Sequence, residues 1–412
     1  MAEKLFRNSK FTFIGELVEG KTLISDEKCG EKGWKKKRMS LGIKNDGNTQ
    51  FLFMEDMYHP DIDTVNMFDK NGNQFKVKKE ETHSEKTMSQ LPDWVKTTID
   101  LETDFEKKKE YTKLFFKKRN DLKKLEETED DETKKELQSK IDEYDKQIKE
   151  LAQNRVEYGT MGDVIEFLGK AITVMKGKKV KVTGKVKCNY YNERNSLRYI
   201  PQTIEFVSDD IENKLSVNCD VFYTDESIMD EPEEKKMYIN GYLGETISKT
   251  DTLIPQQFII NYEKIDETNE QHKKLLDYLK GTFEIEDETK LHKIGVELSV
   301  INGAEIVDFD ESCLTPKQKM EVDLGFHDIN YFRPKGNVYG ERIQELRVVT
   351  GDYKEYPNGA ITVLDKDDLM DLIIKDQKDV TKEDVKKVSE EENEETKEDE
   401  KDPQALMRSL FS

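Results

Sequence analysis

The sequence predicts a mainly β protein in which small barrel-like units are interrupted by an antiparallel helical hairpin and followed by a disordered acidic tail. Three observations predict this class. Apolar and polar residues alternate in two separate stretches, each divided by Gly- and Asn-containing turns. Between these stretches lies a segment rich in Glu, Lys and Leu without Gly or Pro, which is typical of solvated helices. The last part of the chain is strongly acidic, so we expect it to stay unfolded.

The length of 412 residues indicates two or three domains, because a single hydrophobic core rarely organises so long a chain. Charged residues make up 38% of the chain against 34% hydrophobic residues, so part of the length is expected to be solvated helix or tail. The predicted parts are a first β domain at 1–95, a helical hairpin insertion at 96–158, a second β domain at 159–280, a mixed C-terminal region at 281–375 and a disordered tail at 376–412.

The first β domain begins with FTFIGELVEG at 11–20, in which apolar and polar residues alternate. Two turns follow, NDGN at 45–48 and DKNGNQ at 69–74. Asp-Gly and Asn-Gly pairs supply the positive φ angles that a tight hairpin needs. Five short strands between residues 11 and 79 therefore predict a small barrel or a strongly curved sheet.

Residues 100–153 are expected to form two helices joined by the acidic turn EETEDDET. In the second helix apolar residues repeat at steps of four and three, at Leu137, Ile141, Tyr144, Ile148 and Leu151. The first helix follows the same frame, broken once by Lys118, at Tyr111, Phe115, Leu122 and Leu125. Two interpretations stay open. In the first, the hairpin is a packed arm or spacer. In the second, it is a surface for self-association or for a partner protein, because an exposed apolar seam is expected to be buried against another surface.

The second β domain is expected to begin at Val164 and to continue at hairpin-like spacing. Gly184 lies inside a strand pattern and would let that strand bend as barrel closure requires. A hairpin turn is expected at Asn192–Ser196. A helix with the sequence NEQHKKLLDYLKG follows at 269–281.

The region after this helix mixes a strand-like stretch at 292–309 with a short helical pattern at 366–374. It fits either a third small β unit or an extension of the second. From 376 to 402 thirteen acidic residues stand against six lysines, a net charge of −7, so this stretch cannot bury enough apolar surface to fold. The chain then ends in an apolar tip formed by Leu406, Met407, Leu410 and Phe411.

The sequence lacks the motifs and spacings of several common kinds of site. The cysteines lie far apart without CxxC or CxxH spacing, so we expect reduced, mostly buried thiols and no zinc cluster. No GxxxxGK[ST], HExxH, GxSxG or GxGxxG motif points to an enzyme, a cofactor or a metal ion. The N-terminus has no apolar signal region, and no run approaches the roughly 18 to 20 apolar residues of a membrane span, which predicts a cytoplasmic protein. The cysteines are Cys29, Cys188, Cys219 and Cys313.

Two patches combine cations with aromatic residues. Such a mixture is typical of single-stranded nucleic-acid binding, because cations neutralise phosphates while aromatic faces stack on bases without reading their identity. The first patch holds Trp34, Lys35, Lys36, Lys37 and Arg38, beside Phe51, Phe53 and Tyr58. The second patch holds Lys179, Lys181, Lys185, Lys187, Tyr190, Tyr191, Arg194, Arg198 and Tyr199.

Each residue of these patches also has a purely structural interpretation. Phe51 and Phe53 face the same side of a strand, which favours the core over a stacking platform. Lys181 and Lys185 fit an ordinary solvated face. Trp34 and Tyr191 stand next to turn or cationic residues, so they are the better stacking candidates of the two patches.

The net charge of −21 does not favour nucleic acid, so only a local basic groove within the acidic protein could attract it. The acidic tail at 376–402 could lie in that groove and compete with nucleic acid. Such competition would sharpen the salt dependence of binding and discourage loose complexes.

The chain resembles bacteriophage single-stranded DNA-binding proteins of the OB-fold type. The resemblance rests on FTFIGELVEGK, GWKKKRMSLGIK, GKKVKVTGKVKCNYYNERNSLRYIPQTIEFV and the end EEENEETKEDEKDPQALMRSLFS, about half of the chain. It implies tandem OB-like barrels that coat single-stranded DNA without sequence preference during replication or recombination in the host cytoplasm. It also implies that the apolar tip recruits replication or recombination proteins, and that the chain can form a homo-oligomer.

Two other classes of function stay open. A virion or scaffold component would pack its β units against neighbours and oligomerise through the heptad hairpin. An enzyme with a divalent metal held by distant carboxylates, such as a nuclease, is the third alternative, although no spacing among the 88 acidic residues points to it.

Overall fold

The computed structural model describes residues 5–374 except 31, 192–193, 248–249, 267, 286, 308, 335–337 and 352–359. The predicted acidic tail, with Leu406, Met407, Leu410 and Phe411, lies outside the described residues, as do Asn192 and Glu193 of the predicted hairpin turn.

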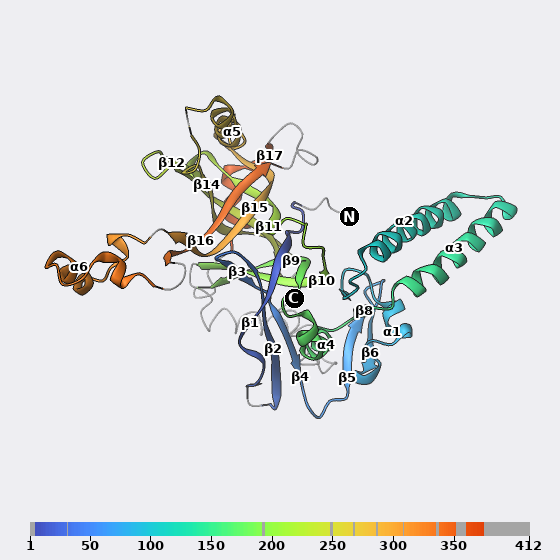
Figure 1. Ribbon diagram of the computed structural model, residues 1–412. Coiled ribbons are helices and arrows are strands. Elements are labelled where there is room, and N and C mark those ends of the chain that lie inside the picture. The colour runs from blue at the N-terminus through green and yellow to red at the C-terminus, as the bar shows by residue number, and fades with distance from the viewer. Residues whose placement is uncertain are drawn as a thin grey trace.

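The protein is mainly β, as the sequence predicts (Figure 1). In the described part of the chain a 15-stranded sheet has the order β4-β2-β3-β15-β16-β14-β13-β11-β1-β9-β10-β7-β8, with β12 beside β13 and β17 beside β15. A separate pair is formed by β5 and β6. The strands are β1 (Lys10–Cys29), β2 (Trp34–Asn45), β3 (Asn48–Phe51), β4 (Met54–Tyr58), β5 (Thr64–Phe68), β6 (Gln74–Lys78), β7 (Thr97–Asp100), β8 (Arg155–Tyr158), β9 (Lys179–Tyr191), β10 (Arg194–Phe206), β11 (Lys214–Tyr223), β12 (Ile228–Glu231), β13 (Lys236–Ile247), β14 (Thr250–Asn261), β15 (Lys290–Val307), β16 (Val338–Gly351) and β17 (Ile361–Asp365).

Helices cover and extend this sheet. In Figure 1 the long helices α2 and α3 reach away from one side of the sheet, and α6 lies at the end of a projection on the opposite side. The helices are α1 (Glu85–Gln90), α2 (Phe105–Glu127), α3 (Asp131–Leu151), α4 (Met161–Met175), α5 (Glu270–Gly281), α6 (Pro316–Asp323) and α7 (Leu369–Leu372).

Strand β1 joins the two β-rich ranges of the sequence. It pairs antiparallel with β2, which follows it along the chain, and also with β9 and β11. Lys10, for example, lies opposite Lys185 on one side and Asn218 on the other. The C-terminal region continues the same sheet, since β15 pairs with β11. Strands from 1–95, 159–280 and 281–375 therefore share one sheet, and the boundaries between these ranges stay predictions.

The two hairpin turns predicted in the first β domain are confirmed. Asn45 pairs with Asn48 across the first turn, where Asp46 has a φ of 52°. The second turn joins β5 to β6, where Gly72 has a φ of 83°. Both turns use the left-handed backbone that Asp, Asn and Gly tolerate best.

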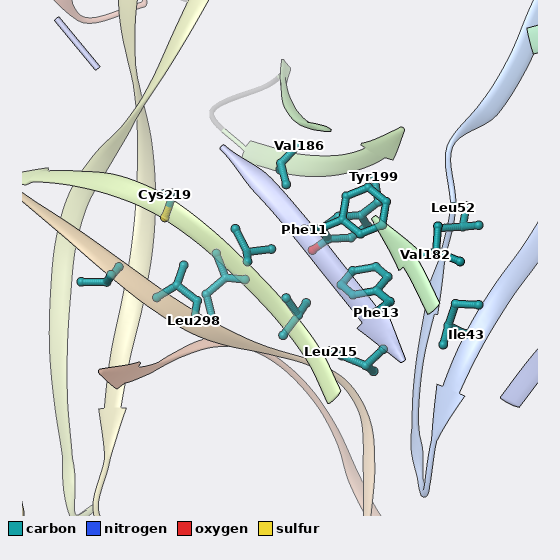
Figure 2. Close-up of a cluster of buried hydrophobic side chains, with 14 of the residues drawn as sticks. Phe11, Phe13, Ile43, Leu52, Val182, Val186, Tyr199, Leu215, Cys219 and Leu298 are labelled. Carbon is teal, nitrogen blue, oxygen red and sulfur yellow. The ribbon is translucent and has the colours of Figure 1, made fainter. Parts of the chain in front are cut away.

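The main core consists of side chains from the sheet, α4 and α5, and it contains a cluster of aromatic rings (Figure 2). The ring of Phe13 lies 4.6 Å from that of Phe11 and 4.8 Å from that of Tyr199. Gly184 makes room for this cluster, because a Cβ there would lie 2.0 Å from the Ile200 carbonyl oxygen and 2.8 Å from the Phe11 ring. Its role is thus close packing of β1, β9 and β10.

The expectation that strands return from Val164 is wrong, because residues 161–175 form α4. The Thr160 side chain accepts a hydrogen bond from the Asp163 backbone N–H and so caps the helix. Below this cap the buried side chains follow helical spacing at Val164, Ile165, Leu168, Ile172 and Met175.

Helices α2 and α3 follow the acidic N-caps Asp104 and Asp130. On α3 the buried residues Leu137 and Ile141 belong to the predicted seam. On α2 the buried residue is Leu114, whereas Phe115 is 47% exposed. The predictions that Phe115 and Leu122 lie in the seam are therefore wrong, since Leu122 is 40% exposed as well, whereas the predicted seam residues Tyr111 and Leu125 are half-buried. Lys118, where the heptad frame breaks, forms an ion pair with Asp145 of α3.

The four cysteines are free thiols. Cys219 is buried, and the other three are half-buried. Burial raises the pKa of the Cys188 thiol to about 12, so this thiol is protonated at neutral pH.

Candidate nucleic-acid interface

Three of the four cations of the first predicted patch form ion pairs with carboxylates. Lys36 and Arg38 approach the two oxygens of Glu55 on β4 at 2.8 and 2.6 Å. Burial raises the pKa of the Glu55 carboxyl, but the hydrogen bonds from Lys36 and Arg38 outweigh it and hold the pKa below its ordinary value. Lys37 lies 2.6 Å from Glu166 of α4. These side chains tie β2 to β4 and α4.

Trp34 and Lys35 lie at the start of the same strand. The half-buried Trp34 ring meets the His59 ring edge to face, with centroids 5.6 Å apart. Lys35 pairs with Lys28 of β1 and Tyr58 of β4 in the strand register. The Trp34 ring thus has a protein partner, and we do not place it in the interface defined below.

Four residues of the second patch also serve the fold. Lys179 donates hydrogen bonds to the carbonyl oxygens of Asp209 and Ile211, and Lys181 lies 2.9 Å from Glu205. Tyr199 is 6% exposed and points into the aromatic cluster of Figure 2, so it cannot stack on a base. Tyr190 pairs with Asn195 on the same face of the hairpin as Tyr199.

The remaining residues of the second patch share the opposite face of the β9–β10 hairpin. Lys187 lies directly opposite Arg198, and Tyr191 lies directly opposite Arg194. Alternation along β9 places Lys185 on the same side. Tyr191 is 61% exposed. We call this set the hairpin face; it consists of Lys185, Lys187, Tyr191, Arg194 and Arg198.

Trp94 extends the hairpin face and was missed by the sequence analysis. Its ring is 63% exposed, and the Lys185 ammonium lies 4.9 Å from the ring centroid. Lys185 and Gln202 both donate hydrogen bonds to the Trp94 carbonyl oxygen, at 3.0 and 2.8 Å. These bonds fix an exposed ring beside a cation. The sequence feature that could have indicated its exposure is the position of this tryptophan inside the polar, turn-like sequence PDWVK.

Phe53 connects the first patch to the hairpin face. Its backbone N–H donates to the Tyr199 carbonyl oxygen at 2.7 Å, and the Arg198 guanidinium lies 4.5 Å from its ring centroid. The prediction that Phe51 and Phe53 lie in the core is wrong, because Phe51 is 46% exposed and Phe53 is half-buried on the same side of the segment. The buried side chains of this segment are the alternate ones, Gln50, Leu52 and Met54.

Cavities adjoin both ends of this arrangement. One of about 440 Å³ is lined by Arg38, Phe53 and Glu55 among others. Another of about 330 Å³ is lined by residues that include Lys10 and Lys96. Lys10 lies opposite Lys185 across β1 and β9, so the second cavity adjoins the hairpin face. Asp93 also lines this cavity and forms an ion pair with Lys96 at 3.0 Å.

Like charges accumulate on the hairpin face. Burial lowers the pKa of the Lys185 ammonium, and the positive charge of Lys187 lowers it further. Burial also lowers the pKa of the Arg198 guanidinium, an effect opposed by Glu55 and reinforced by Arg38. Mutual repulsion of this kind is relieved when an anion such as a phosphate binds.

No group of three or more His, Cys, Asp or Glu side chains in the described part of the chain is placed to hold a metal ion. None of the described helices has the length and apolar character of a membrane span. Comparisons of the chain with models of protein families, with curated proteins and with solved structures find no match.

Proposed function

We propose that this protein binds single-stranded DNA without sequence preference and coats it during phage replication or recombination. One observation carries the proposal: the hairpin face places Lys185, Lys187 and Arg198 together, with the exposed rings of Trp94 and Tyr191 on either side. The phosphates of a nucleic acid would neutralise these mutually repelling cations, and its bases would stack on the exposed rings.

The chemistry of the face explains why no sequence preference is expected. Ammonium and guanidinium groups neutralise phosphates and release counterions, whatever the base. Trp94 and Tyr191 offer flat faces on which any base can stack. From Lys185 to Tyr191 the hairpin extends about 20 Å, at roughly 3.3 Å per residue, which leaves room for several nucleotides.

The finer parts of the proposal concern the rest of the chain. We propose that the ranges 1–95 and 159–280 are OB-like units that share β1. The acidic stretch 376–402 competes for the basic face, and the apolar tip recruits a polymerase, primase or recombinase. Binding needs no cofactor and no turnover, and it takes place in the cytoplasm of the host.

The test is fluorescence anisotropy of a labelled oligo-dT of about 30 nucleotides, titrated with the full chain. The double variant Lys187→Gln/Arg198→Gln is compared with Lys273→Gln, an exposed lysine of α5 that forms no ion pair with a described residue. The proposal predicts tight binding by the full chain and by Lys273→Gln, and weaker binding by the double variant. Equal affinity of all three proteins would count against the hairpin face as the interface.

An assembly role is the second candidate function, because the projection around α6 presents exposed apolar side chains. Met320 and Leu324 are each 62% exposed, and Phe326 and Tyr331 are each 69% exposed. Large exposed apolar side chains close together indicate a protein contact. Light scattering of the full chain without nucleic acid tests this role: a defined high-order oligomer supports it, and a monomer does not.

A further inference from the structure

The helix α2 carries an exposed apolar strip outside the face that contacts α3. Phe115, Phe116 and Leu122 are 47%, 54% and 40% exposed. Phe115 and Leu122 lie two helical turns apart on one face. The Phe116 ring meets the Phe115 ring edge to face, with centroids 6.3 Å apart. The contact with α3 uses a different face of the helix, where Leu114 is buried. We call Phe115, Phe116 and Leu122 the α2 strip.

Basic residues surround the α2 strip. Helix α2 contains nine Lys or Arg against five Asp or Glu, whereas α3 contains five Lys against seven Asp or Glu. Arg119 lies four residues after Phe115 and three before Leu122, and Lys113 lies three residues before Phe116. Neither cation forms an ion pair with a described residue. A ligand for this face should therefore be both apolar and negatively charged.

The chain itself contains a segment of this chemistry. Residues 376–402 have a net charge of −7, and the apolar side chains of Leu406, Met407, Leu410 and Phe411 follow directly. Leu406 comes 32 residues after Ile374, the last described residue. Such a tether reaches at most about 110 Å, at roughly 3.5 Å per residue. It also holds the tip at an effective concentration of the order of millimolar near its own chain.

We propose that the C-terminal segment 376–412 docks on the α2 strip of its own chain. The apolar tip packs against Phe115, Phe116 and Leu122, and acidic residues before the tip lie beside Arg119 and Lys113. This complementarity of charge and apolar surface distinguishes the α2 strip from the projection around α6, because the two lysines of α6 are balanced by Glu321 and Asp323. A partner protein that binds the apolar tip must therefore compete with α2 for it. The inference does not depend on DNA binding.

The test uses the full chain with photoreactive benzoylphenylalanine in place of Phe411. After irradiation, cross-linked peptides are identified by mass spectrometry, and the product mass shows whether one or two chains are joined. The proposal predicts cross-links within one chain to peptides from α2. The yield of these α2 cross-links should fall as NaCl is raised from about 50 to about 500 mM, because salt screens the attraction between the acidic segment and the cations of α2.

Two matched variants locate the site. Phe115→Ser/Phe116→Ser should lower the yield by about tenfold, because it removes most of the apolar contact. Phe326→Ser/Tyr331→Ser removes two rings that are even more exposed, from the projection around α6, and should leave the cross-linking yield unchanged. An unchanged yield in the α2 variant, cross-links elsewhere, or a two-chain product overturns the proposal. If the α2 variant keeps its cross-links but loses affinity for oligo-dT, the strip serves nucleic acid instead.

Discussion

The substitution Trp94→Leu separates binding from stability. The Trp94 ring is 63% exposed, and the contact it loses within the protein is the approach of the Lys185 ammonium at 4.9 Å. A cation–π contact at an exposed site is worth about 0.5 to 1 kcal/mol. The hydrogen bonds from Lys185 and Gln202 go to the Trp94 backbone and survive the change. The free energy of unfolding should therefore fall by no more than about 1 kcal/mol.

The expected loss of DNA affinity is larger. Stacking of one base on an aromatic ring is worth about 1 to 3 kcal/mol, which corresponds to about 5- to 150-fold in the dissociation constant. Anisotropy of labelled oligo-dT measures the affinity, and urea unfolding measures the stability.

The other tryptophan of the chain is the matched control. Trp34 is half-buried against His59, so Trp34→Leu should lower the free energy of unfolding by about 1 to 2 kcal/mol, less than the cost of emptying a fully buried site. Its effect on oligo-dT affinity should be small. The reasoning is refuted if Trp34→Leu weakens binding more than Trp94→Leu does.

Three further outcomes follow from the same contacts. Replacing Lys187 and Arg198 by Gln should reduce the slope of log affinity against log salt by about 0.7 per lost phosphate contact, measured by titrations at several NaCl concentrations; an unchanged slope would contradict their role. The folded-state pKa of Glu55 is lowered, so its ion pairs contribute stability above the ordinary pKa of 4.5, and this contribution is lost as the pH falls through the lower folded value. Urea unfolding of Glu55→Gln should show a deficit against the parent protein at pH 7 that shrinks in acid, and a constant deficit would argue against the ion pairs. Gly184→Ala should lower the free energy of unfolding by about 1 to 3 kcal/mol, because its Cβ would meet the Ile200 carbonyl oxygen at 2.0 Å; an unchanged urea midpoint would refute this.

Local features of the fold could be predicted because neighbouring residues determine them. The turn at Asn45–Asn48 is set by Asp-Gly backbone preferences, and the seam of α3 is visible in the spacing of Leu137 and Ile141. Helix α4 was missed, although Thr160 and the helical spacing of its buried residues were present, because its short apolar stretch also fits a strand.

Contacts between distant segments could not be predicted. Tyr199 and Arg198 are adjacent in the sequence, and the pairing of β10 with β9 decides which of them faces the core. The partners that neutralise Lys37 and Arg38 are Glu166 on α4 and Glu55 on β4. The place of Trp94 beside Lys185 depends equally on tertiary packing.

Ultraviolet cross-linking of oligo-dT to the full chain tests the central claim most directly, because one measurement reports both binding and its location. After digestion, mass spectrometry identifies the peptides that carry nucleotide. The account predicts cross-links at Trp94 and Tyr191, lost at high salt. The absence of cross-links at low salt, or cross-links confined to the peptide of Trp34 or to the projection around α6, would contradict it.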